Sequence, residues 1–183
     1  MRRVAGQPMA ESKNGKNKNL EVAPKESPAK NQPIPIQAKV VSQYLKDLSF
    51  ENPNIRKLIQ SSGNPPSLKV EVNVNAERLD KDLFESSIDL KATASNNLGT
   101  IYVLESVYGG MFKIESIPDA ALEPFLLISA PTTLFPFLRR LVADVTREGG
   151  FPPLLLDPID FAALYFRRQQ ERAAATSIAK HNA

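Results

Sequence analysis

The chain has 183 residues, with 23 Lys and Arg against 20 Asp and Glu, a single His and no Cys. The absence of cysteine excludes disulfides, thiolate catalysis and cysteine-based metal sites. The basic surplus is confined to residues 1–33, which hold seven basic and three acidic side chains. The rest of the chain is near neutral, which argues against a nucleic-acid-binding domain with a basic face.

Residues 1–33 are rich in Lys, Asn, Glu, Pro and Ser and almost empty of large apolar side chains. Such a segment buries too little apolar surface to offset the entropy of ordering, so we expect a disordered tail. A basic arm for nucleic acid or acidic lipid is the alternative, which the interspersed Asn, Pro and Glu disfavour. Neither an apolar signal-peptide core nor a run of about 18 apolar residues is found, which favours a cytoplasmic protein without membrane insertion.

Four strands are predicted in the first part of the folded body, over residues 36–50, 68–74, 84–94 and 100–108. Within 68–74, Leu and Val alternate strictly with polar residues, which is the pattern of a half-buried strand. The 100–108 strand is apolar on both faces and therefore needs two covers. One is expected to be its own helices, and the other a second subunit or a ligand. Gly109-Gly110 predicts a bulge or turn after this strand.

Three helices follow, predicted over residues 119–127, 134–147 and 158–175. The middle one is expected to start after Thr132-Thr133, and its apolar stripe is wider than one partner surface requires. Strands followed by helices are the α+β order. One domain over residues 34–175 is therefore expected, with a flexible C-terminal tail over 176–183.

The run from Gly149 to Phe161 joins the last two helices and is unusually apolar for a loop. The two glycines end the preceding helix, and Pro152-Pro153 prevents another from starting at once. The next helix is predicted to begin at Pro158, with Asp157 as its N-cap and Asp160 in its first turn. Because loops normally lie on the surface, the apolar part of this run must be covered by something.

Catalytic chemistry has little support in this sequence. The only His, His181, stands in a polar tail, and without Cys or a second His the usual nucleophile–base triads cannot form. Phosphate-loop and dinucleotide-binding glycine motifs are also missing, so ATP use is not expected. An enzyme that relies on carboxylates alone stays open, with Asp157 and Asp160 as the nearest pair, although helix capping explains both.

Three carboxylates on the predicted strands have a different character. Asp47 and Glu51 are four residues apart, so they point to the same side of the first strand. Glu105 interrupts an apolar face, where an unpaired buried charge would be costly. It is expected to lie at a rim or to meet a cation from a partner.

Four blocks of sequence together resemble the SecB family of bacterial protein-export chaperones, over about residues 36–170. They are Lys46-Asp47-Leu48-Ser49-Phe50-Glu51-Asn52-Pro53-Asn54, Tyr108-Gly109-Gly110-Met111-Phe112, Leu134-Phe135-Pro136-Phe137 and the run from Gly149 to Phe161. The resemblance implies a four-stranded antiparallel sheet with C-terminal helices packed on one face. It also implies a cytoplasmic, ATP-independent holdase that forms a homotetramer, a dimer of dimers, and needs no cofactor or metal. Such a holdase binds unfolded preproteins and delivers them to the translocase ATPase SecA.

The same resemblance implies two sets of site residues. The positions that contact SecA fall on Asp47, Glu51, Val103 and Glu105. The positions that affect client binding fall on Tyr102, Leu104, Ser106 and Tyr108 of the fourth strand and on Phe151, Leu154 and Leu156 of the apolar run. A related chaperone dedicated to one partner, such as an antitoxin, is the alternative reading of the same scaffold.

Overall fold

The computed structural model describes residues 37–60 and 63–181. By its internal contacts the chain divides into two units, Met1–Ile34 and Pro35–Ala183. The predicted disordered tail, residues 1–33, lies outside the described residues, as do the last two residues of the predicted C-terminal tail.

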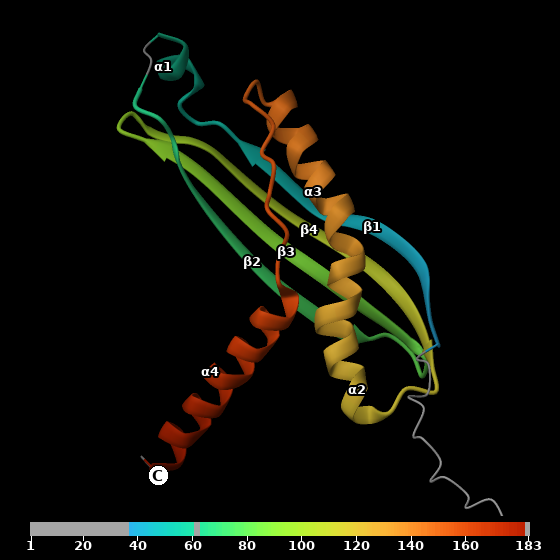
Figure 1. The fold of residues 1–183 in the computed structure, drawn as a ribbon. Coiled ribbons are helices and arrows are strands. Elements are labelled where there is room, and N and C mark those ends of the chain that lie inside the picture. Colours follow the sequence, from blue (N-terminus) through green and yellow to red (C-terminus); the bar gives the residue numbers. More distant parts are fainter. Residues whose placement is uncertain (1–36, 61–62, 182–183) are drawn as a thin grey trace, which may run out of the picture. The chain divides into compact units, whose positions relative to one another are not determined.

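Four antiparallel strands form a single sheet in the order β1-β4-β3-β2 (Figure 1). The strands are β1 (Gln37–Glu51), β2 (Ser67–Arg78), β3 (Leu83–Asn96) and β4 (Gly99–Glu115). β1 and β2 are therefore the two edges, and a short helix, α1 (Ile55–Gln60), lies between them in sequence. The α+β class and the four-stranded antiparallel sheet are confirmed.

β4 continues through Gly109 and Gly110 to Glu115, so the predicted bulge or turn at these glycines is wrong. Gly110 instead allows a helix to approach the sheet closely, since a Cβ there would lie 2.7 Å from a methyl carbon of Leu134. The irregularities lie in β1, whose register against β4 shifts between Val40 and Ser42 and between Leu45 and Asp47.

Residues 119–148 form one continuous helix rather than the two that were predicted. Its parts are α2 (Asp119–Pro124), a π-helical turn η1 (Phe125–Ser129) and α3 (Ala130–Glu148). Thr132 and Thr133 do not start a helix but lie inside one. Their hydroxyls donate to the carbonyl oxygens of Ile128 and Ser129, at 2.6 and 3.1 Å, which suits a helix interior.

This long helix covers one face of the sheet (Figure 1). Leu134, Leu138 and Val142 are fully buried in the core, together with Leu104 and Phe112 of β4. By length and composition alone the helix would also qualify as a membrane span, a test that core helices of soluble proteins pass as well. The predicted packing of helices on one face is confirmed.

The last helix, α4, spans Phe161–His181 and begins three residues later than predicted. Asp160, not Asp157, is its N-cap, because the Asp160 carboxylate accepts the Ala163 N–H at 2.9 Å. Asp157 is exposed and precedes Pro158 in the extended part of the loop. α4 also runs past Ala175, where the predicted helix ended.

Candidate functional site

α3 ends at the glycine pair, as the sequence predicted, and the chain turns there into the apolar loop. Gly150 has a left-handed φ of 85°, and its N–H donates to the carbonyl of Arg147 at 3.0 Å. The Phe151 N–H donates to the carbonyl of Thr146 at 3.1 Å, which completes a Schellman cap. Gly149 is required for packing, since a Cβ would lie 2.4 Å from the ring of Phe50.

The turn places Phe151 in an aromatic cluster with Phe50 of β1 and Tyr102 of β4. The ring centroids lie 5.6 Å apart for Phe50 and Tyr102, 5.2 Å for Tyr102 and Phe151, and 6.3 Å for Phe50 and Phe151. Tyr102 and Phe151 form part of the wall of an almost wholly apolar cavity of about 380 Å³, which Leu58, Leu68 and Leu154 also line.

A second cavity of about 700 Å³ continues along β2 and shares Leu68 and Leu154 with the first. Most of its walls are apolar side chains of β2, of the loop and of the start of α4: Leu68, Val70, Val72, Leu154, Leu156, Ile159 and Leu164. Glu71, Asn73, Asp157 and Arg167 add polar groups to the same lining. Together the two cavities form one largely apolar trough between β2 and the loop. We call it the β2 groove.

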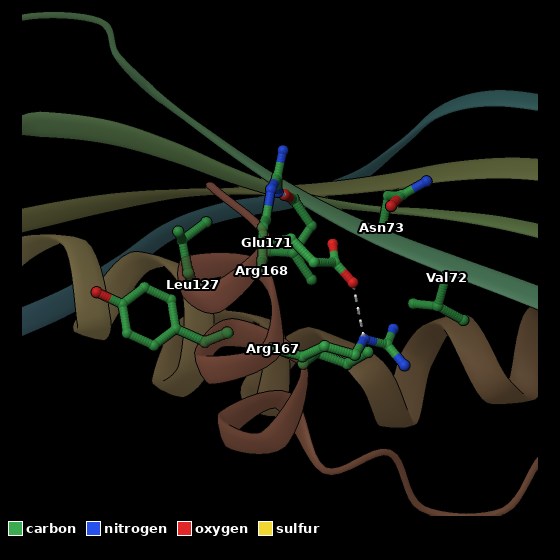
Figure 2. A pocket seen from close by; sticks show the side chains of 9 residues that line it. Val72, Asn73, Leu127, Arg167, Arg168 and Glu171 are labelled. Carbon is green, nitrogen blue, oxygen red and sulfur yellow. Dashed lines mark hydrogen bonds and ion pairs between the residues drawn. The ribbon is translucent and has the colours of Figure 1, made fainter. Parts of the chain in front are cut away.

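The groove continues toward α4 into a smaller cavity of about 150 Å³ (Figure 2). Val72 of β2 lies on one side, and Arg167 of α4 forms an ion pair with Glu171 on the other, at 3.8 Å. The Arg168 guanidinium donates to the backbone carbonyl of Val74 at 2.7 Å. The polar end of the groove is therefore built by α4.

The Val74 carbonyl accepts this bond on the outer edge of the sheet, where β2 has no neighbouring strand. In an antiparallel ladder the backbone groups of alternate residues point outward. Leu68, Val70 and Val72 are in phase with Val74 and so present their N–H and C=O groups at the same edge. Within the described part of the chain, no other segment forms backbone hydrogen bonds with these three residues. An open strand edge thus borders the β2 groove.

The face of the sheet opposite the helices is polar and carries many carboxylates. Cross-strand neighbours on this face include Glu51 with Val103, and Asp47 with Val107. Glu105 is half-exposed here and forms an ion pair with Lys91 of β3 at 2.5 Å. This pair raises the pKa of Lys91. The cation that Glu105 was expected to meet at a partner is therefore supplied, in this chain, by its own neighbouring strand.

A second polar cluster on this face was not predicted. Tyr44 and Lys46 of β1 reach across Gly109 of β4 and both hydrogen-bond to Glu85 of β3, with the Lys46 Nζ at 2.5 Å. Burial, with the Glu85 hydrogen bond, raises the pKa of Tyr44 to about 12. Burial alone would raise the pKa of Glu85, but the hydrogen bonds from Lys46 and Tyr44 lower it.

Comparison with known proteins agrees with this architecture. The family model described as preprotein translocase subunit SecB matches residues 29–172. The chain belongs to the SecB family. The protein-export protein SecB of a Bradyrhizobium species is 41% identical over 162 residues, covering 88% of this chain and 94% of that protein. SecB of Parvibaculum lavamentivorans is 42% identical over 146 residues, covering 80% and 87%.

A solved structure extends the likeness to the fold. A SecB-like chaperone of Mycobacterium tuberculosis, in complex with a ChAD peptide from the HigA1 antitoxin, matches with a TM-score of 0.55. It is 15% identical, and the match covers 67% of this chain and 90% of that one. The SecB family is a family of export chaperones and not of enzymes.

The residues that the resemblance predicts to bind clients do not all lie in one place in this chain. Tyr102, Phe151, Leu154 and Leu156 line the β2 groove. Leu104 and Ser106 are 0% and 2% exposed, so both are buried within the subunit.

Ser106 and Tyr108 both lie outside the groove. The Ser106 hydroxyl has no hydrogen-bond partner among the described residues. Tyr108 stacks on Phe137 of α3, with ring centroids 6.4 Å apart, and does not line the groove.

The residues that the resemblance predicts to contact SecA come together more closely. They lie on the polar face, on the adjacent strands β1 (Asp47 and Glu51) and β4 (Val103 and Glu105). Glu51 and Val103 are direct cross-strand partners. The groove residues lie on the helix side of the same sheet. The two sets are thus separated by the thickness of the sheet.

Proposed function

We propose that this chain is an ATP-independent holdase that keeps unfolded preproteins competent for translocation and delivers them to SecA. The observation that carries the proposal is the β2 groove, an apolar trough bordered by an open strand edge. Residues 34–175 are proposed as the chaperone domain, acting in the cytoplasm. The sequence holds no phosphate-binding glycine loop, which supports release by handover rather than by nucleotide hydrolysis.

The groove suits extended chains of varied sequence. Burial of apolar client side chains against Phe151, Leu154 and Leu156 is worth roughly 25 cal/mol per Å² and requires no particular sequence. A client that lies along β2 can also exchange backbone hydrogen bonds with Leu68 and Val70, because any polypeptide carries the same backbone groups. Folded proteins hide both features, so selectivity for unfolded chains follows.

The polar face is proposed as the SecA surface, through Asp47, Glu51, Val103 and Glu105. Asp47 and Glu51 are exposed, and Glu105 is half-exposed beside Lys91. Because this surface and the groove lie on opposite faces of the sheet, SecA and a client can be bound at the same time. This arrangement supports transfer from one protein to the other.

We propose that the working unit is a homotetramer, a dimer of dimers. The edge strand β1 exposes four large apolar side chains, Val40, Val41, Leu45 and Leu48, and α3 exposes Phe137. A monomer would leave these in water beside an open strand edge, which is an unusual surface for a soluble protein. Several grooves in one assembly raise avidity for a long client through effective concentration.

A chaperone dedicated to one partner is the second candidate. Its support is the Mycobacterium tuberculosis SecB-like chaperone, which was solved with an antitoxin peptide. The two functions differ in their range of clients, because a dedicated chaperone would protect a single protein.

The test is suppression of aggregation for several unrelated unfolded proteins, measured by light scattering without ATP. The proposal expects all of them to be protected at a small molar excess of chaperone. Protection of one client alone would support the dedicated chaperone. Protection of none would contradict the general holdase and leave the dedicated chaperone as the candidate.

A further inference from the structure

Thr146 stands in the last turn of α3 and is completely buried. Its hydroxyl lies 2.9 Å from the carbonyl oxygen of Val142 and 3.1 Å from that of Ala143, to which it donates. The same hydroxyl accepts the backbone N–H of Leu154 at 2.9 Å. The Thr146 carbonyl accepts the N–H of Phe151 at 3.1 Å.

These bonds account for every backbone donor in the first part of the loop. Pro152 and Pro153 have no N–H, so the stretch from Phe151 to Leu154 offers only two donors, one at each end. Both donate to Thr146. One buried side chain and its own carbonyl therefore hold the two ends of this stretch against α3.

The two residues held in this way are both groove residues. Phe151 belongs to the aromatic cluster and lines the first cavity. Leu154 lines both the first cavity and the second, so it stands where the two join. Leu68 of β2 also lines both cavities, so the loop and the sheet each contribute a leucine to this junction.

We propose that Thr146 is a positioning residue for client binding: its hydroxyl fixes Leu154 and so keeps the β2 groove open to an extended chain. The inference rests on the proposed holdase function. Thr146 does not touch the client and acts through Leu154 and Phe151. Valine has nearly the same shape but accepts no hydrogen bond, and it would leave the Leu154 N–H without its partner. Serine keeps the hydroxyl.

The experiment compares Thr146→Val, Thr146→Ser and Thr133→Val in the full-length chain. Thr133 is the control for loss of a threonine hydroxyl that bonds back along the same helix: its hydroxyl donates to the Ser129 carbonyl, and the side chain is exposed rather than buried against the loop. The probe is fluorescein-labelled, reduced and carboxymethylated α-lactalbumin, which stays unfolded. Kd is measured by fluorescence anisotropy, and exchange of the Leu154 amide is followed by NMR or mass spectrometry. Native mass and SecA binding verify that the assembly and the polar face are intact.

We expect Thr146→Val to weaken binding of the probe about fivefold, the equivalent of one lost hydrogen bond. Its Leu154 amide should exchange faster than in the wild type. Thr146→Ser and Thr133→Val should bind within about twofold of the wild type. If the Val variant does not fold, Thr146→Ala removes the same hydroxyl and carries the same expectation.

Two results would overturn the inference. One is unchanged probe binding by the Val or Ala variant despite faster Leu154 exchange. The other is a Ser variant as weak as the Val variant, which would show that the hydroxyl is not what matters. A wild-type protein that does not bind the probe at all would instead contradict the holdase function itself.

Discussion

Replacing Phe151 with Ala separates client binding from the other activities of this chain. Phe151 is partly buried in the aromatic cluster, so roughly a third of its surface or less remains to contact a client. Full burial of a Phe side chain is worth about 1.5–3 kcal/mol, and a third of that is about 0.5–1 kcal/mol. Phe151→Ala should therefore weaken binding of an unfolded client about two- to fivefold per groove.

The matched control is Phe166→Ala. Phe166 is 60% exposed on α4, and its one ring contact among the described residues is an edge-on contact with Tyr165. It lines none of the cavities of the groove. It offers at least as much aromatic surface to solvent as Phe151 but lies outside the groove. Client Kd for both variants would be measured by anisotropy, and SecA binding by calorimetry. Equal client affinity in the two variants, or an equal loss of SecA binding in Phe151→Ala, would refute the assignment of clients to this groove.

Three other predictions follow from the sheet. Reversing the charge at Glu51 and Glu105 should weaken SecA binding by calorimetry and leave client Kd unchanged, and a parallel loss of both would argue against two separate surfaces. Gly110→Val should destabilise the subunit by about 1–3 kcal/mol in urea denaturation, since even a Cβ meets Leu134 at 2.7 Å; an unchanged midpoint would contradict the close helix packing. The pKa of Tyr44 is raised from 10.0 to about 12, so the folded state holds this proton more tightly than the unfolded chain. The stability that this proton contributes should therefore be fully present below pH 10 and be lost as the pH rises toward 12. Tyr44→Phe should remove this part of the decline in the free energy of unfolding.

Much of the fold followed from local pattern. Alternation at 68–74 predicted a half-buried strand, and β2 lies there. The two-sided apolar pattern of 100–108 predicted a strand covered on both faces, and the structure supplies the cover by the chain's own helix. The continuous helix was missed because Thr132 and Thr133 resemble a helix start. Only the structure shows that their hydroxyls bond back along the helix.

The site was predictable only in part. Asp157 and Asp160 both precede apolar residues and both suit an N-cap, and the choice depends on how far the extended loop runs before α4. The cluster of Tyr44, Lys46 and Glu85 spans three strands, so no spacing along the sequence indicates it. The groove also depends on the path that the loop takes in space. An apolar run predicts burial, but it does not predict the cavity that forms beside β2.

Backbone exchange at the edge of β2 tests the central claim most directly. Amide hydrogen exchange of Leu68, Val70 and Val72 would be measured in the full-length protein, with and without an unfolded preprotein. If clients lie in the β2 groove as an added strand, these outward amides should become protected when the client binds. Saturating client binding without any change at these amides would contradict the claim.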